Sequence, residues 1–353
     1  MNKIEEIDLN VTNRCNIGCS HCLFSAGPER GDDLPLNLIK KVLSDGRRLG
    51  AKEVHITGGE PLVRKDVLEI LKITHTLGYF VRLQTNLWAF QQEMIPQFKK
   101  YTREILTSID GLEKSHDSIR RKDSFRRTIS WIKKLLQKDF RIVVITAVQK
   151  KNCNDIMKLV NLLVKIGINA HFLFSVTPLG RAKKSDVVAP GKWEQLIFNL
   201  QEKYKSIPTK TDIVCELHHL RADAKINFIE PDCRLDTKNH VIILPNGEVF
   251  PCSLFTSTDK SLGNVKRKSL FEIWTNSPVW DFYAVKNDDP ECKNCKLWGL
   301  CKGGCRGYSY LFAGSMKKKD PRCEKNRYPV CPSWKLNIKN LSLACATWKV
   351  MKR

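Results

Sequence analysis

The stretch Cys15-Asn-Ile-Gly-Cys19-Ser-His-Cys22 follows almost directly on an alternating segment, Ile7-Asp8-Leu9-Asn10-Val11-Thr12, that predicts a first β-strand. Thiolates are the soft ligands that hold zinc or iron-sulfur clusters. A loop with three cysteines can hold one corner of a four-iron cubane and leave one iron without a protein ligand. We therefore expect a metal centre after the first strand. A zinc loop and a chance grouping among the 14 cysteines are the alternatives.

A second motif follows the next predicted strand, Val54-His55-Ile56-Thr57, which runs into Gly58-Gly59-Glu60-Pro61. Paired glycines at the end of a strand let backbone groups approach a ligand closely. Glu60 can accept a hydrogen bond from an ammonium group, and Pro61 fixes the turn. Taken alone, this tetrapeptide would predict only a structural turn.

Together these two motifs resemble those of the radical S-adenosylmethionine (radical SAM) enzymes. The resemblance implies that Cys15, Cys19 and Cys22 bind a 4Fe-4S cluster whose open iron is chelated by the amine and carboxylate of SAM. It also implies cofactor contacts at His21, which packs near the adenine. Further contacts are implied at the segment that binds the SAM amino group, Gly58, Gly59, Glu60 and Pro61.

Strand and helix patterns alternate along the first half of the chain, which predicts a parallel α/β architecture. The predicted strands are Glu6–Thr12, Glu53–Thr57, Tyr79–Thr85, Glu104–Ile109, Arg141–Val148 and Ala170–Val176. The predicted helices are Leu36–Leu49, Val67–Leu77, Gln91–Lys100, Phe125–Gln137 and Asp155–Ile166. Six such units match the open, partial (β/α)6 TIM-type barrel of the radical SAM family.

Polar residues at the carboxyl ends of barrel strands are candidates for the site. We predict further SAM contacts at Asn86, Ser108, Asn152 and Arg181. The run that begins at Ser108, Ser-Ile-Asp-Gly, is similar to a stretch common in peptide-modifying members of the family. Leu87 follows Asn86, at a position where the family often has glycine.

Beyond about residue 211 the cysteine density rises and the alternation stops, so we predict a barrel over 1–210 and a second domain over 211–353. Asn246-Gly247 predicts the turn of a β-hairpin. Seven cysteines there resemble the SPASM extension of radical SAM enzymes, which binds auxiliary 4Fe-4S clusters. The resemblance assigns Cys233, Cys252 and Cys305 to a nearer cluster and Cys292, Cys295, Cys301 and Cys323 to a distal one.

The fourth ligand of the nearer cluster is left open by the sequence. Cys215 or Cys331 could supply it, or an open iron could bind substrate. Zinc ribbons are the alternative for the whole set of seven.

Composition limits the class of protein and its surroundings. No apolar run is long enough to span a membrane and the N-terminus lacks a signal-peptide pattern, so we expect no membrane partner. Fourteen cysteines without a secretion signal favour metal ligands in a reducing cytoplasm. The net charge of +23 attracts anionic partners, but solvated helix faces account for most of it and we expect no nucleic-acid partner.

The resemblance implies an enzyme that cleaves SAM reductively to a 5'-deoxyadenosyl radical, which abstracts hydrogen from a substrate. Such an enzyme needs an external electron donor such as flavodoxin or ferredoxin. We expect the substrate to be a ribosomally made peptide or protein. The first alternative is a tetrapyrrole, sugar or other metabolite, because the stretch from Gly303 to Gly307 resembles members that decarboxylate tetrapyrroles as well as members that mature quinone-cofactor peptides. A non-catalytic metal-binding scaffold is the remote alternative.

Overall fold

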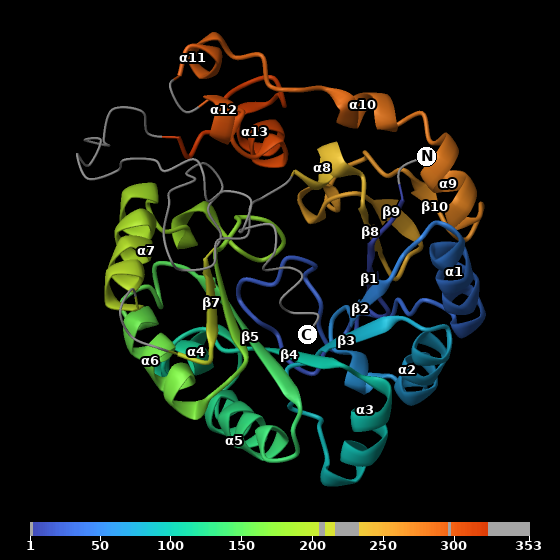
Figure 1. Cartoon of the computed structure of the whole chain (residues 1–353), viewed down its shortest axis with the longest axis vertical. Coiled ribbons are helices and arrows are strands. Elements are labelled where there is room, and N and C mark those ends of the chain that lie inside the picture. The colour runs from blue at the N-terminus through green and yellow to red at the C-terminus, as the bar shows by residue number, and fades with distance from the viewer. Residues whose placement is uncertain (1–2, 205–208, 216–232, 296–297, 324–353) are drawn as a thin grey trace.

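A single sheet organises the computed structural model, which describes residues 3–204, 209–215, 233–295 and 298–323 (Figure 1). The predicted ligand Cys331 lies outside these residues. Within them, no helix is both long and apolar enough to cross a membrane.

The sheet has ten strands in the order β10-β9-β8-β1-β2-β3-β4-β5-β6-β7. The strands β1 to β6 are Glu6–Asn10, Glu53–Thr57, Phe80–Gln84, Glu104–Ser108, Arg141–Val148 and Ala170–Ser175. They confirm the six predicted strands to within two residues at each end. The further strands are β7 (Asp212–Cys215), β8 (His240–Ile243), β9 (Glu248–Phe250) and β10 (Gly263–Asn264).

Helices cover the outside of the curved sheet and one of its edges, and they make the barrel-like shape seen in Figure 1. They are α1 (Leu36–Arg48), α2 (Val67–Thr76), α3 (Ile95–Tyr101), α4 (Glu113–Ile119), α5 (Ser124–Leu136), α6 (Ile156–Ile166) and α7 (Pro190–Tyr204). Apolar residues on the outer strand faces, such as Ile7, Val54 and Val144, belong to the main core with the helices. Consecutive strands from β1 to β7 pair in parallel, as a βα architecture requires.

The cysteine-rich part continues this sheet. β8 pairs in parallel with β1, with Glu6 opposite His240, and β8 and β9 form the predicted hairpin. Gly247 in its turn has a φ of 92°, which glycine adopts without strain. The helices after it are short: α8 (Arg234–Thr237), α9 (Leu270–Asn276), α10 (Trp280–Ala284), α11 (Pro290–Lys293), α12 (Trp298–Cys301) and α13 (Arg306–Ala313). Because β7 and β8 lie in one sheet with the barrel, the division at residue 210 stays a prediction.

Candidate functional site

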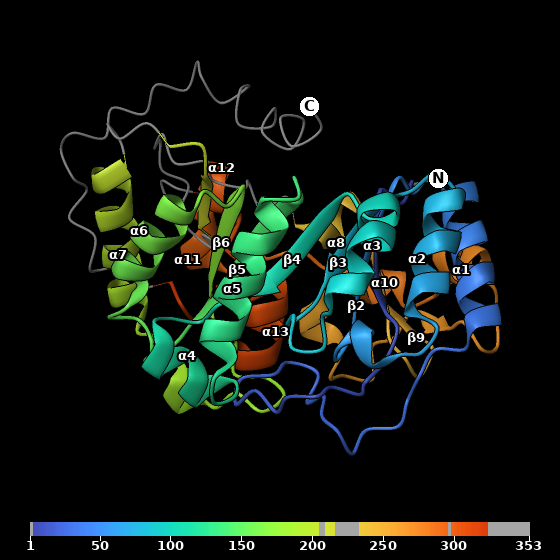
Figure 2. The same cartoon turned by 90° about the horizontal axis from the view of Figure 1, so that it is seen from below.

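The three N-terminal cysteines lie in the loop between β1 and α1, at the carboxyl end of β1. Figure 2 shows this part of the chain in dark blue along the lower edge of the molecule. Cys15 and Cys19 are buried and Cys22 packs against them in a small cluster separate from the main core. Burial raises the pKa of the Cys15 thiol to about 12, and the neighbouring Cys19 and Cys22 thiols add to this rise. The thiols are therefore gathered in one place, and metal binding would displace their protons.

Two side-chain donors from neighbouring loops face these sulfur atoms. Asn86 Nδ2 lies 3.8 Å from Cys15 Sγ, and Arg120 Nη1 lies 3.7 Å from Cys19 Sγ. Donors of this kind stabilise metal-bound thiolates, which carry negative charge. The residues present thus fit an iron-sulfur cluster held by Cys15, Cys19 and Cys22.

Asp110 fixes the position of Arg120. Arg120 Nε donates to Asp110 Oδ2 at 2.6 Å, and His21 Nε2 lies 3.5 Å from the same oxygen. Burial alone would raise the pKa of Asp110, but the charge of Arg120, followed by those of His21 and His116, outweighs it and lowers the pKa. The ionised carboxylate therefore holds the guanidinium beside Cys19. Asp110 lies in the Ser-Ile-Asp-Gly run that begins at Ser108, but no pattern in the sequence links it to Arg120 and Cys19.

Gly58 and Gly59 bring the end of β2 against the cysteine loop. Gly59 N donates to Thr12 O at 2.7 Å, and Glu60 N donates to Arg14 O at 2.9 Å. A Cβ atom on Gly59 would collide with the carbonyl oxygen of Arg14, and one on Gly58 would collide with that of Thr12. Both positions therefore require glycine for the approach of the two loops. Their contact with the SAM amino group stays a prediction.

Glu60 ties the ends of β2 and β3 together. Its side chain is fully buried and accepts hydrogen bonds from Leu62 N at 3.0 Å, Thr85 Oγ1 at 2.8 Å and Asn86 N at 2.7 Å. Burial nevertheless raises its pKa to about 7. Pro61 begins the short 3-10 turn Pro61–Val63 directly after it. The predicted contact of Glu60 with an ammonium group stays a prediction.

Arg181 holds the cysteine loop from the end of β6. Its Nε donates to Cys19 O at 2.7 Å and its Nη1 to Ala26 O at 2.8 Å. Asn152 instead uses its side-chain amide for hydrogen bonds within the barrel, since Nδ2 donates to Asp110 O at 3.0 Å and to Ala147 O at 2.9 Å. Ser108 is half-buried at the end of β4. Their roles as cofactor contacts stay predictions.

The C-terminal cysteines fall into two groups. Burial raises the pKa of Cys252 to about 12, and the nearby Cys305 and Cys233 raise it further. Burial likewise raises the pKa of Cys323, and the Cys301 and Cys295 thiols raise it further. Cys292 is buried in α11. In the part of the chain that the structure describes, no three such side chains converge as the ligands of a single ion would.

Cys215 is separate from both groups. It ends β7, at the opposite end of the sheet from β8 and β9, and its side chain is part of the main core. Burial is the cause that raises its pKa to about 12. The structure therefore does not bring Cys215 to Cys233, Cys252 and Cys305, although the sequence offered it as their partner.

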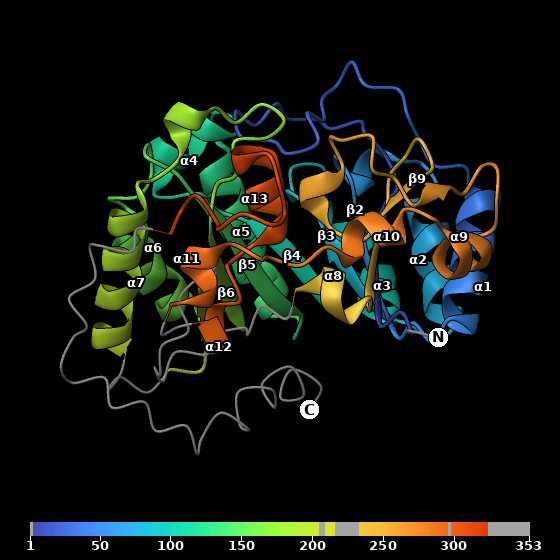
Figure 3. The same ribbon diagram turned by 90° about the horizontal axis from the view of Figure 1, so that it is seen from above.

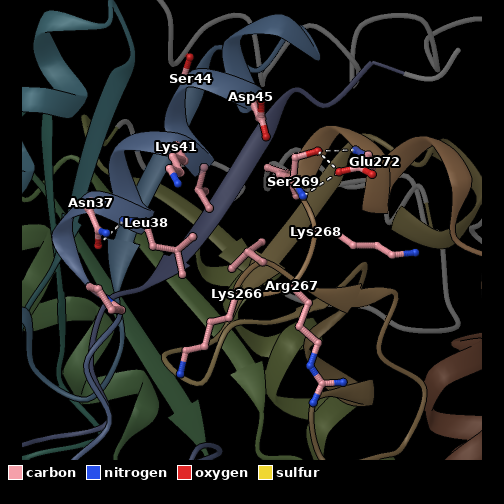
Figure 4. A pocket seen from close by; sticks show the side chains of 14 residues that line it. Asn37, Leu38, Lys41, Ser44, Asp45, Lys266, Arg267, Lys268, Ser269 and Glu272 are labelled. Carbon is pink, nitrogen blue, oxygen red and sulfur yellow. Dashed lines mark hydrogen bonds between the residues drawn. The ribbon is translucent and has the colours of Figure 1, made fainter.

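A pocket of about 610 Å³ lies away from the cysteines, between α1 and the segment that joins β10 to α9 (Figure 4). Its lining includes Lys41, Lys266, Arg267 and Lys268. None of the predicted site residues lines it.

Comparison with known proteins agrees with the assignment of the N-terminal cysteines and of the C-terminal cysteines to iron-sulfur clusters. The sequence profile of the radical SAM superfamily matches residues 9–163, and that of the SPASM iron-sulfur cluster-binding domain matches residues 233–296. Together the two matches cover more than half of the chain. Cys301, Cys305 and Cys323 lie beyond the second match.

Two relatives and one solved structure illustrate the range of similar proteins. The chain is 28% identical to an AdoMet-dependent heme synthase of Methanosarcina barkeri, over 89% of this chain and 94% of the relative. It is 30% identical to the Bacillus subtilis antilisterial bacteriocin subtilosin biosynthesis protein AlbA, over 84% of this chain and 65% of the relative. The crystal structure of Streptococcus suis SuiB bound to its precursor peptide SuiA has the same fold, with a TM-score of 0.78 at 19% identity over 92% of this chain and 76% of that chain.

Three observations point to the same family. They are the cysteine loop at the end of β1, the contact of Gly58 and Gly59 with that loop (the glycine clip), and the two matched profiles. The chain therefore belongs to the radical SAM superfamily, as an enzyme with a C-terminal SPASM domain that uses 4Fe-4S clusters and S-adenosylmethionine.

Proposed function

We propose that this enzyme modifies a ribosomally made peptide or protein. A relative named for bacteriocin biosynthesis and a structural neighbour bound to a precursor peptide support the proposal. The similar heme synthase shows that kinship alone is compatible with a different substrate. The inner wall of the barrel favours the peptide.

The arginines on the inner strand faces are paired with carboxylates near the start of the strands. Arg82 lies 3.1 to 3.2 Å from three glutamates, Glu6, Glu53 and Glu104. Arg141 Nε lies 2.6 Å from Glu104 Oε1. Arg82 and Arg141 are the arginine or lysine residues on the inner faces of β1 to β8 as the structure describes them, and both are paired. A substrate with several carboxylates therefore finds no free arginine or lysine on these strands.

Closer to the strand ends, where the cysteine loop lies, the inner wall is uncharged. Gln84 and Ser108 are half-buried on β3 and β4, and Ile145, Phe172 and Phe174 are half-buried on β5 and β6. Such a surface of amide, hydroxyl and apolar groups suits a peptide backbone with apolar side chains. This distribution of charge is the observation that carries the proposal.

In this mechanism, the chain's own residues bind and orient the cluster and the substrate. When bound, the N-terminal cluster supplies the single electron that cleaves SAM. Cys15, Cys19 and Cys22 would hold that cluster, while Arg181 and Gly59 keep their loop in place. The inner wall would position the substrate C–H bond and exclude water. We place the enzyme in the reducing cytoplasm, with two auxiliary clusters bound by the two C-terminal cysteine groups.

Decarboxylation of a tetrapyrrole is the second candidate. It is favoured by the heme synthase, because that relative aligns with this chain over 94% of its own length.

The two substrates can be separated with the anaerobically reconstituted enzyme, SAM and dithionite. Short peptides encoded next to the gene are tested in parallel with an iron porphyrin that carries propionate side chains, and products are read by mass spectrometry. We expect a peptide to lose two hydrogen masses and the porphyrin to stay unchanged. Loss of carbon dioxide together with two hydrogens from a porphyrin side chain, with every peptide unchanged, would overturn the proposal.

A further inference from the structure

The loop with the three N-terminal cysteines lies directly beneath the protein surface. Gly18 and Ser20 alternate with the buried Cys19 and are both exposed. Figures 2 and 3 show the loop after β1 and helix α4 along one edge of the molecule. Ser20 N donates to Ile119 O at 2.8 Å, so the end of α4 touches the loop. An electron that reaches this cluster from outside has a short path here.

Four exposed cations lie on or beside the segments that touch this loop, and we call Arg121, Lys122, Arg127 and Lys151 the basic ridge. Arg121 Nη1 donates to Asn16 O at 3.0 Å, within the cysteine loop itself. Lys151 Nζ donates to Ser118 O at 3.1 Å, in the last turn of α4. Arg121 is therefore held to the cysteine loop itself, and Lys151 is held to the helix whose end touches that loop.

Trp88 adds a rigid aromatic surface to the basic ridge. The Arg121 guanidinium lies 4.3 Å from the centre of its ring, and the Arg127 guanidinium lies 5.2 Å away. Trp88 is half-buried, so part of its ring faces the surface. Tryptophan and arginine are the residues that most often dominate binding energy at protein interfaces.

Acidic residues on the same segment do not cancel this charge. Asp117 accepts hydrogen bonds from the backbone N–H groups of Asp123 and Phe125, at 2.7 and 2.8 Å. Glu113 pairs with Arg126, which is outside the basic ridge, at 2.5 Å. Asp123 is exposed and Asp117 keeps its charge, so two carboxylates lie beside the four cations. The surface over the cysteine loop is thus positive and suits an acidic partner.

We propose that the basic ridge and Trp88 form the docking surface for an acidic one-electron carrier protein of the flavodoxin or ferredoxin class. One electron leaves the reduced carrier and enters the cluster held by Cys15, Cys19 and Cys22. The carrier is oxidised and the cluster is reduced by one electron, and no atom crosses the interface. Electron-transfer contacts are small and weak, so steering by charge largely sets their rate.

The test reverses three ridge charges that do not touch the cysteine loop, in the variant Lys122→Glu, Arg127→Glu, Lys151→Glu. The dissociation constant of oxidised flavodoxin is measured by calorimetry on the reconstituted holoenzyme. Formation of 5'-deoxyadenosine is then driven either by reduced flavodoxin or by dithionite. We expect the dissociation constant to rise and the flavodoxin-driven rate to fall, each by about tenfold or more. The dithionite-driven rate should stay unchanged.

A matched control reverses Lys41, Lys266 and Arg267 to glutamate in the pocket of Figure 4, with the same loss of charge from +23. Figures 1 and 2 place α1 and α4 on opposite sides of the molecule, so this variant should bind flavodoxin almost as the wild type does. The proposal is overturned if both variants weaken binding equally, or if the ridge variant leaves binding and rate unchanged. If the ridge variant also loses the dithionite-driven rate, the milder Lys122→Gln, Lys151→Gln variant is tested in its place, and the same results support or overturn the proposal. Absence of any SAM cleavage with dithionite in the wild type would contradict the enzyme assignment instead.

Discussion

Cys22 is the least buried of the three thiols in the N-terminal loop, since Cys15 and Cys19 are 7% and 8% exposed while Cys22 is partly exposed. Its replacement therefore removes a ligand with little loss of packing. We expect Cys22→Ala to bind about four fewer iron atoms per chain and to release no 5'-deoxyadenosine. After anaerobic reconstitution, iron analysis measures the bound iron and liquid chromatography measures the released 5'-deoxyadenosine. Cys153→Ala is the control, because Cys153 is a buried core residue, and its iron content should equal that of the wild type.

Glu60 has a fully buried carboxylate that accepts from three donors. In Glu60→Gln, one oxygen becomes an NH2 group and must face an N–H or O–H donor. We expect this mismatch to lower the free energy of unfolding by about 1 to 3 kcal/mol, measured by denaturant titration. Glu69→Gln is the control. It breaks only the half-exposed ion pair with Lys40 and should change the free energy of unfolding by less than about 1 kcal/mol. Equal effects of the two substitutions would contradict the structural role of Glu60.

His171 is buried as a neutral imidazole, and its Nε2 lies 2.8 Å from Thr146 Oγ1. Burial lowers its pKa from 6.5 to about 3. Between these values the unfolded chain binds more protons than the folded chain, so stability is lost as the pH falls below 6.5. From pH 7.5 to pH 6.0 this residue should lower the free energy of unfolding by about 0.8 kcal/mol. His171→Gln keeps a donor toward Thr146, and denaturant titrations at the two pH values should show a correspondingly smaller loss.

Between elements, the approach of the loop after β2 to the loop after β1 depends on Gly59. Any side chain there collides with the Arg14 carbonyl, so Gly59→Ala must displace the cysteine loop. We expect SAM cleavage driven by dithionite to fall by about 10-fold to 100-fold. Gly27→Ala is the matched control in the cysteine loop, because a Cβ atom at Gly27 meets nothing within 4 Å. A similar loss of activity in both variants would contradict the role of Gly59 in positioning the cysteine loop.

The sequence predicts elements well where the pattern is local. Strand β5 has the predicted limits because its run of β-branched residues is long and apolar. The sequence does not predict helix α4, because Glu-Lys-Ser-His-Asp-Ser-Ile has no apolar stripe. Strand β7 has only four residues, and α7 begins with Pro190-Gly191. The pairing of β8 with β1 joins residues more than 230 positions apart, which no local pattern indicates.

The candidate site shows the same limit. The cysteine spacings and Gly58-Gly59 are visible in the sequence because the ligands of each loop are close along the chain. Arg120 lies 101 positions from Cys19, and Asp110 is not adjacent to either. Asn86 was predicted as a cofactor contact, whereas its distance to Cys15 follows from the arrangement of β1 and β3. Contacts made by tertiary packing therefore need the structure.

Across the whole molecule, the hydrophobic core is unevenly distributed. Strands β1 to β9 and the outer helices share one large core that extends to Phe255, Trp280 and Tyr283. From residue 286 to residue 323, the buried apolar residues that the structure describes are Cys292, Tyr308 and Met316. A region with so few buried apolar groups has little hydrophobic stabilisation of its own. Its predicted ligands, Cys292, Cys295, Cys301, Cys305 and Cys323, lie within this region.

Bound clusters should therefore supply much of the folding free energy of this region, because metal binding and folding are coupled where no preformed core exists. We expect limited trypsin digestion of cluster-free protein to cleave first at Lys293, Lys302 and Lys317, while α1 to α6 stay intact. The reconstituted protein should resist cleavage at these three lysines under the same anaerobic conditions. Mass spectrometry of timed samples identifies the sites. Identical digestion patterns with and without clusters would mean that residues 286–323 fold without their metals, and that these cysteines contribute to chemistry but not to stability.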